Sequence, residues 1–371
     1  MKNRLLPTIK GYRILDRYIL GKFLSTYLFG LAIIIVIVVV FDYTEKVDDF
    51  TETKASLRGI VVDYYLNFIP YFINQFSGLF TFISVIFFTS KMASQTEIVA
   101  ILSGGVSFNR FLWPYFMGAT VIAAISFALS LWVIPVSQRD CVEFQRKHIK
   151  RNMTLAYDPD IYRQIDDGTY AYVRGYSPNL ERIPYFAIDR FDGSSMVEQL
   201  DAAGVTFDPE TRRWSAPRYT IRRFVDGDEI SFKQYRNLDT LINLDARELG
   251  HVESLIKTMT IGELNDFLAQ QRKKGADDVY IIEVERHARF SYPFSAIILT
   301  LIGVSLSSRK VRGGMGFHIG MGIALCFAYI MCGRVFEQIA MSGSLPAWFG
   351  VWLPNIIFAV IAVVIYYKAP K

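Results

Sequence analysis

Apolar residues gather into six long runs along the chain, three before residue 136 and three after residue 285. Each run comes close to the roughly 20 apolar residues that a helix needs to cross a bilayer. Polar stretches separate the runs, and tryptophans or tyrosines stand at the ends of several, as in an aromatic belt. The pattern therefore predicts six membrane-spanning helices, at about Phe23–Phe41, within Ile60–Phe88, and at about Phe111–Ile134, Phe290–Leu306, Met315–Val335 and Trp348–Tyr367.

The first run has an alternative reading as a cleavable signal peptide. It is long for that purpose, and no small-x-small cleavage site comes before the acidic segment TEKVDDFTET. We interpret it as a retained span. Pro70 lies inside the second run, where it should kink the helix or set its register.

Between the two sets of runs, from Pro135 to about Val284, charges are frequent and the apolar residues alternate with polar ones. Short segments such as TYAYVRGY and EISFKQY have the period of two that is typical of strands, and turn signals such as Asp192-Gly193 separate them. The pattern predicts an all-β domain at 137–284, inserted between membrane parts at 1–136 and 285–371. A helix should close the insertion, since Thr260 and Glu263 have capping-box spacing and Gly275 is a stop signal.

The loop between the second and third runs carries a shorter helical pattern, at 94–107. Ser94 and Glu97 have the Ser-x-x-Glu spacing of a capping box. Three apolar residues then fall on one helical face, and a glycine pair ends the segment; these are Ile98, Ile101, Leu102, Gly104 and Gly105. The pattern predicts a short amphipathic helix on which a partner protein can push.

The composition agrees with a membrane protein that carries a polar domain. The 371 residues are 52% hydrophobic, and the mean hydropathy is +0.26. A net charge of +5 without a clustered basic face does not indicate nucleic-acid binding. Lys and Arg concentrate before the first run, in the loop after the fourth and at the C-terminus, which predicts cytosolic termini. The β domain would then lie in the periplasm of a Gram-negative cell.

Motifs of catalysis are missing from the sequence. No P-loop and no HExxH occurs, and the four histidines have no zinc spacing. Gly303-Val304-Ser305-Leu306 only partly resembles a serine-hydrolase elbow and lies within a span. Asp63 is best read as a polar residue at the end of a helix. We predict no catalytic residue, no metal site and no cofactor site, so any energy source must come from another chain.

Four segments in this order resemble the LptF/LptG permease family of the lipopolysaccharide export transporter. They are Ile14–Ile19 (ILDRYI), Glu97–Ser107 (EIVAILSGGVS), Phe207–Trp214 (FDPETRRW) and Leu345–Pro354 (LPAWFGVWLP). The ILDRYI start and the short length resemble LptG more than LptF. The resemblance implies a non-enzymatic ABC-transporter permease with a jellyroll-like β domain. Its implied partners are a dimeric cytosolic ATPase that binds ATP and Mg²⁺, a second related permease, a periplasmic bridge protein and lipopolysaccharide.

The resemblance also implies roles for particular residues, each with a plainer alternative. Glu97 would contact the ATPase, or only cap its own helix, and Lys46 would contact lipid phosphate, or be a solvated loop charge. Ring residues of the second run would line the lipid cavity, or pack against neighbouring helices, and a GxxxG pair would pack at a lateral gate, or within the subunit. The implied sets are Glu97, Ile98, Ile101, Leu102 and Gly104 for coupling to the ATPase; Lys46, Phe68, Phe72 and Phe76 for lipid; and Gly316 and Gly320 for the gate.

Two other functions compete with this hypothesis. The chain would be a non-transporting scaffold or sensor if its β domain bound a periplasmic ligand and its cytosolic loop bound a regulator. A secondary transporter fits less well, because the runs hold few charges and no inverted repeat is evident.

Overall fold

The computed structural model describes residues 14–149, 161–174, 182–208, 211, 213–225, 228–240, 252–273, 278–308 and 314–369. Six helical segments of this part of the chain are long and apolar enough to cross a membrane, which confirms the prediction of six spans. They are α1 (Ile14–Glu52), η1 (Gly59–Tyr65) with α2 (Leu66–Ser94), α4 (Phe108–Ala128) with η2 (Leu129–Val133) and α5 (Ile134–His148), α8 (Val279–Ser307), α9 (Gly314–Met341) and α10 (Ala347–Lys368).

The first three spans are longer than the apolar runs that predicted them. They cover 36 to 39 residues each, whereas the last three have 29, 23 (counted from Ile319 of α9) and 22. At 1.5 Å per residue the first three are about 55 Å long, against a hydrocarbon core of about 30 Å. Their polar ends carry no hydropathy signal, so the sequence showed only their apolar centres.

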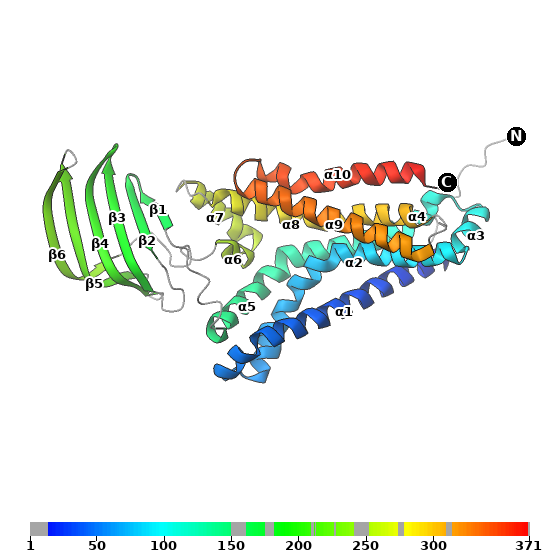
Figure 1. Ribbon diagram of the computed structural model, residues 1–371, viewed down its shortest axis with the longest axis horizontal. Coiled ribbons are helices and arrows are strands. Elements are labelled where there is room, and N and C mark those ends of the chain that lie inside the picture. The colour runs from blue at the N-terminus through cyan, green and yellow to red at the C-terminus, as the bar shows by residue number, and fades with distance from the viewer. Residues whose placement is uncertain are drawn as a thin grey trace.

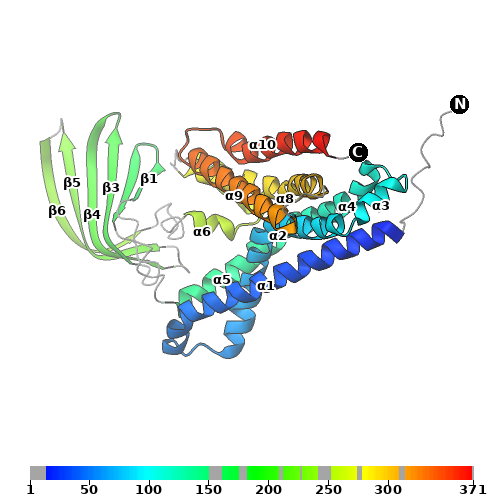
Figure 2. The same ribbon diagram turned by 45° about the vertical axis from the view of Figure 1, so that its right-hand side comes forward.

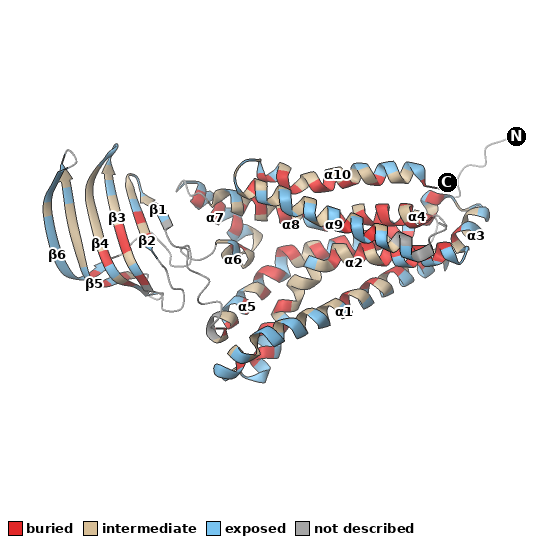
Figure 3. Ribbon diagram, viewed as in Figure 1, coloured by how far each residue is buried: buried red, intermediate tan, exposed pale blue. Residues whose placement is uncertain are grey.

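The spans form two limbs that separate toward the β sheet (Figures 1 and 2). α1, α2 and α5 slant away from α8, α9 and α10 at that end, while α3 (Glu97–Ser103) and the end of α10 lie at the opposite end. Buried side chains concentrate where the helices face one another (Figure 3). Within the most apolar stretch of each span, 61% of the residues of α8 are buried, but only 17% of those of α1 and 11% of those of α9. α1 and α9 therefore expose most of their apolar surface.

A six-stranded antiparallel sheet forms the inserted domain and confirms the predicted β fold. Each strand pairs with its neighbours in sequence, so the order is a meander rather than a Greek key. The Asp192-Gly193 turn is found between the third and fourth strands, with Gly193 at φ +62°. Trp214 and Phe186 stack at the centre of its core. The strands are β1 (Ile161–Asp166), β2 (Thr169–Arg174), β3 (Arg182–Asp192), β4 (Ser195–Asp208), β5 (Arg213–Val225) and β6 (Asp228–Thr240).

The strands occupy only part of the predicted insertion at 137–284. Its described strands run from residue 161 to residue 240, because the third span continues as helix α5 to His148 and helices α6 (Val252–Lys257) and α7 (Ile261–Lys273) follow the sheet. The predicted capping box of α7 is confirmed: the Thr260 amide donates to Glu263 Oε2 at 2.8 Å, and the Glu263 amide donates to Thr260 Oγ1 at 3.4 Å. Gly275, the predicted stop, lies outside the described residues.

Candidate functional site

The short helix α3 lies at the end of the bundle opposite the sheet, and its predicted capping box is wrong. Helix α2 continues to Ser94, whose hydroxyl donates to the Lys91 carbonyl of its own helix at 2.8 Å. Thr96 is the N-cap instead, at φ +63°, and it makes no side-chain cap hydrogen bond. α3 consequently runs from Glu97 to Ser103, inside the predicted 94–107.

The apolar face of α3 points into this chain's own bundle. Ile98 is only 1% exposed, and Ile101 and Leu102 pack against the same core cluster. The side chain of Ile98, which the resemblance assigns to coupling, is therefore already covered by the bundle. The opposite side of α3 is open, with Val99 55% exposed and Gly104 exposed behind it.

Glu97 is partly buried and contacts the first span. The Tyr18 hydroxyl of α1 donates to Glu97 Oε2 at 3.3 Å. Arg110 at the start of α4 forms a bidentate ion pair with Asp16 of α1, at 2.6 and 2.5 Å. Asp16 is 3% exposed, and paired charges of this geometry hold a fixed orientation. α3 is thus linked to α1 by the Tyr18–Glu97 hydrogen bond as well as by its apolar face, and α1 is in turn linked to α4 by the ion pair.

Lys46 lies near the sheet-side end of α1 and is held inward. Its ammonium donates to Asp42 and, at 2.5 Å, to the Tyr64 hydroxyl, and it lies 5.1 Å from the centre of the Tyr64 ring. Its side chain is 15% exposed. Asp42 therefore already balances the charge that the resemblance assigns to a lipid phosphate. The Phe68 ring lies 5.7 Å from the same ammonium, so the structure brings two of the predicted lipid residues together.

Phe68, Phe72 and Phe76 form a ladder of rings along α2. Their consecutive centroids are 4.3 and 6.1 Å apart. Phe68 is buried in a cluster with the ends of α1 and α5, while Phe72 is only partly covered by that cluster. Phe76 lines a cavity of about 230 Å³.

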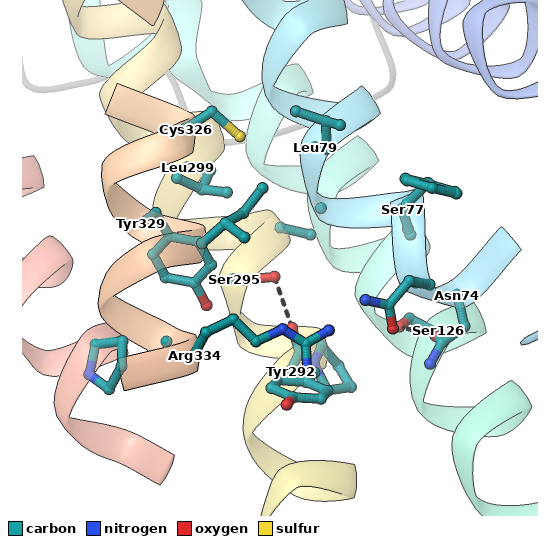
Figure 4. A pocket seen from close by; sticks show the side chains of 18 of the residues that line it. Asn74, Ser77, Leu79, Ser126, Tyr292, Ser295, Leu299, Cys326, Tyr329 and Arg334 are labelled. Carbon is teal, nitrogen blue, oxygen red and sulfur yellow. Dashed lines mark hydrogen bonds between the residues drawn. The ribbon is translucent and has the colours of Figure 1, made fainter. Parts of the chain in front are cut away.

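This cavity lies between α2, α4, α8, α9 and α10, and its polar residues were missed by the sequence reading (Figure 4). The Tyr292 hydroxyl donates to Glu337 at 3.0 Å. On the other wall, the Ser126 hydroxyl donates to Asn74 Oδ1 at 2.5 Å. The available signal was Arg334 and Glu337, one turn apart at the end of an apolar run.

The glycines of α9 divide into two kinds. A Cβ placed on Gly316 or Gly320 meets no heavy atom within 4 Å, whereas one on Gly322 collides with Ile86 of α2. Gly322 therefore packs within the subunit, and the GxxxG pair faces open space in this chain. Lys46 and Phe68 contact each other, but neither lies within 4 Å of a Cβ placed on Gly316 or Gly320.

Two comparisons with known proteins agree with this architecture. The family model described as lipopolysaccharide export system permease LptF/LptG matches residues 17–368, nearly the whole chain. The chain is also 20% identical, over 351 residues, to the lipopolysaccharide export system permease protein LptG of Haemophilus influenzae. That alignment covers 93% of this chain and 96% of the relative. With six spans, an inserted antiparallel sheet and a family match of this extent, the chain belongs to the LptF/LptG family of lipopolysaccharide export permeases, and within it is similar to LptG.

Proposed function

We propose that this chain is one of two permease subunits that move lipopolysaccharide from the inner membrane to a periplasmic bridge protein, driven by a separate dimeric ATPase at α3. Family membership makes it a multi-pass inner-membrane transporter subunit rather than an enzyme. In the proposal, ATP and Mg²⁺ are bound by the ATPase and no cofactor by this chain.

The observation that carries the proposal is the placement of α3 and the sheet at opposite ends of six apolar helices (Figure 1). The excess of Lys and Arg near the chain ends assigns the α3 end to the cytosol. The sheet is then periplasmic. Energy from a cytosolic ATPase enters at one end of the bundle, and lipid leaves toward the sheet at the other.

In coupling, the two sides of α3 have different roles. Glu97, Gly104 and the exposed side of the helix contact the ATPase. Ile98, Ile101 and Leu102 couple by fixing α3 to its own bundle, so that a push on α3 also displaces α1 and α4. The Tyr18–Glu97 and Asp16–Arg110 contacts support this route.

For lipid, the proposal places the second permease along α1 and α9, whose apolar surfaces this chain leaves largely uncovered. The open faces of Gly316 and Gly320 allow close helix approach there. Acyl chains lie against Phe72 and Phe76, with Phe68 beneath them. A lipid phosphate that contacts Lys46 competes with Asp42 for its ammonium.

The test is the Glu97→Lys variant, expressed in native membranes with Ser94→Ala as the matched control. We expect the ATPase and a second permease to co-purify with the unsubstituted chain. In Glu97→Lys, ATP hydrolysis should no longer drive lipid release, whereas Ser94→Ala should behave normally because Ser94 caps nothing. Normal lipid export by Glu97→Lys would refute the coupling role, and absence of both partners would favour the scaffold or sensor alternative.

A further inference from the structure

The turn between α6 and α7, at Thr258–Thr260, occupies a special position in the chain. The β insertion leaves the membrane bundle from α5, which belongs to the first three spans, and rejoins it through α6 and α7 ahead of α8. α6 lies between the sheet and the bundle in both views (Figures 1 and 2). Whatever holds this turn therefore fixes the place at which the chain that follows the sheet rejoins the bundle.

Arg289 of α8 binds the turn from the side of the last three spans. Its guanidinium donates to the carbonyls of Ile256 and Met259, each at 2.7 Å, and to Glu285 at 2.9 Å. The last carbonyls of a helix lack intrahelical partners and carry partial negative charge, so a cation is favoured at the end of α6. Arg289 is 4% exposed, and a buried arginine in a span is rare unless its donors are satisfied in this way.

Arg139 of α5 binds the same turn from the side of the first three spans. Its Nη2 donates to the Thr258 carbonyl at 3.2 Å and pairs with Glu263 at 2.9 Å. Glu263 also accepts the Thr260 amide, so one carboxylate both caps α7 and holds Arg139. Accordingly, the Thr260 contacts and Arg139 lower the pKa of Glu263 below its usual range.

We infer that the α6–α7 turn is a clamp between the two limbs of the bundle, with Arg139 and Arg289 as positioning residues that set where the chain that follows the sheet rejoins the bundle. One arginine comes from each limb, and their contacts meet within the segment 256–263. Arg272 of α7 adds an ion pair to Glu283 of α8 on the side of the last three spans. The Arg139 contacts are the complementary link to the first three.

This clamp rests on the proposed function for its purpose, which is to keep the sheet aligned with the lipid route while the limbs move. Lipid that has left the bilayer must enter the sheet at its base. A turn held by both limbs keeps that entrance aligned with the lipid route between them. A turn held by α8 alone would move with the last three spans and not with the first three. The Arg139–Glu263 pair is half exposed, so its loss should cost little stability.

The experiment measures spin-label distances in the full complex in bilayers, with the three cysteines replaced by alanine. One label pair, at Val142 and Ala269, measures the distance between α5 and α7. A second pair, at Ala269 and Phe294, measures the distance between α7 and α8. Glu263→Gln keeps a side-chain acceptor for the α7 cap but removes the charge that holds Arg139. Thr260→Ala weakens the cap and keeps the ion pair.

We expect the α5–α7 distance distribution, narrow in the unsubstituted protein, to broaden in Glu263→Gln and Arg139→Gln. The α7–α8 distance distribution should stay unchanged in both variants. Arg139→Lys, which keeps the charge, should restore most of it. An α5–α7 distance that stays narrow in Glu263→Gln overturns the inference. So does an equal broadening in Thr260→Ala, because the cap and not the clamp would then be responsible.

A lipid measurement on the same variants tests the purpose of the clamp. Photocrosslinking groups at Phe72 and at Phe232 of β6 report lipid in the bundle and on the sheet. We expect Glu263→Gln to reduce crosslinking at position 232 and not at position 72. Equal crosslinking at both positions with a broadened distance overturns the role in transfer. Absence of lipid from both positions in the unsubstituted protein would instead show that the proposed function fails.

Discussion

The contact between α1 and α4 depends on a glycine, and adding one methyl group there should destabilise the bundle. A Cβ on Gly118 of α4 would lie 2.6 Å from Cε1 and 2.7 Å from Cδ1 of Phe23 in α1, and 3.0 Å from Leu20. Ordinary contact begins near 3.4 Å, so the Phe23 ring would have to move by about 0.8 Å, the difference between 3.4 and 2.6 Å. Phe23 is fully buried, which leaves the ring no free space.

We expect Gly118→Ala to lower the free energy of unfolding. Overpacking of a filled core costs about 1–3 kcal/mol, and replacing glycine by alanine in a helix returns about 0.5–1 kcal/mol. The net loss is about 1 kcal/mol, within a range of about 0–2.5 kcal/mol. Gly21→Ala in α1 is the matched control, because a Cβ there meets no heavy atom within 4 Å, and it should stabilise by about 0.5–1 kcal/mol.

The assay is reversible unfolding of the purified chain in mixed micelles, followed by circular dichroism across a series of denaturing-detergent fractions. Both variants should keep the helical content of the parent. A Gly118→Ala protein as stable as the parent, or a Gly21→Ala protein that loses as much stability, would show that the close packing of Phe23 on α4 is not what holds these helices together.

Two further predictions concern polar groups. Burial and then the Asp201 carboxylate raise the pKa of Tyr185 in the sheet to about 12. Because this pKa lies above the unfolded value of about 10, the contribution of Tyr185 to stability is complete below a pH of about 10 and is lost as the pH rises from about 10 to about 12. An absorbance titration in which Tyr185→Phe removes no late-titrating phenol would contradict this assignment. Asn74→Ala should lower the stability of the bundle by about 0.6–2 kcal/mol, because Asn74 forms hydrogen bonds from the second span to Ser126 and Ser130 of the third. The loss stays small because both serine hydroxyls can turn to carbonyls of their own helix. A loss as large as that of a core cavity, in the same unfolding assay, would contradict this reasoning.

The sequence predicted most of the fold because apolar runs and alternating strands leave strong periodic signals. It failed where a helix continues without such a signal. Residues 137–148 are polar, so hydropathy assigned them to the β domain, although α5 there packs an aromatic face on the ends of α1 and α2. The same limitation explains Ser94, whose capping spacing was real but whose backbone belongs to the preceding helix.

The candidate site was predicted less well than the fold, because burial and partner choice are properties of the packed chain. The apolar spacing of Ile98, Ile101 and Leu102 defined a face correctly but not the neighbour that covers it. Lys46 was identified as a charge near the end of a span, yet nothing in its local sequence shows that the Tyr64 hydroxyl would accept a hydrogen bond from it. Arg139 and Arg289 are far apart in sequence, so only the fold shows that both reach one turn.

The length of α1 gives it the mechanics of a lever. Its 39 residues form one continuous helix, and the Asp16–Arg110 pair holds it close to one end, as a fulcrum would. A tilt of about 5° at that pair would move the far end of a helix of about 58 Å by about 5 Å. A small displacement of α3 that tilts α1 would thereby be amplified at the opposite end of the bundle, where the two limbs separate (Figure 1).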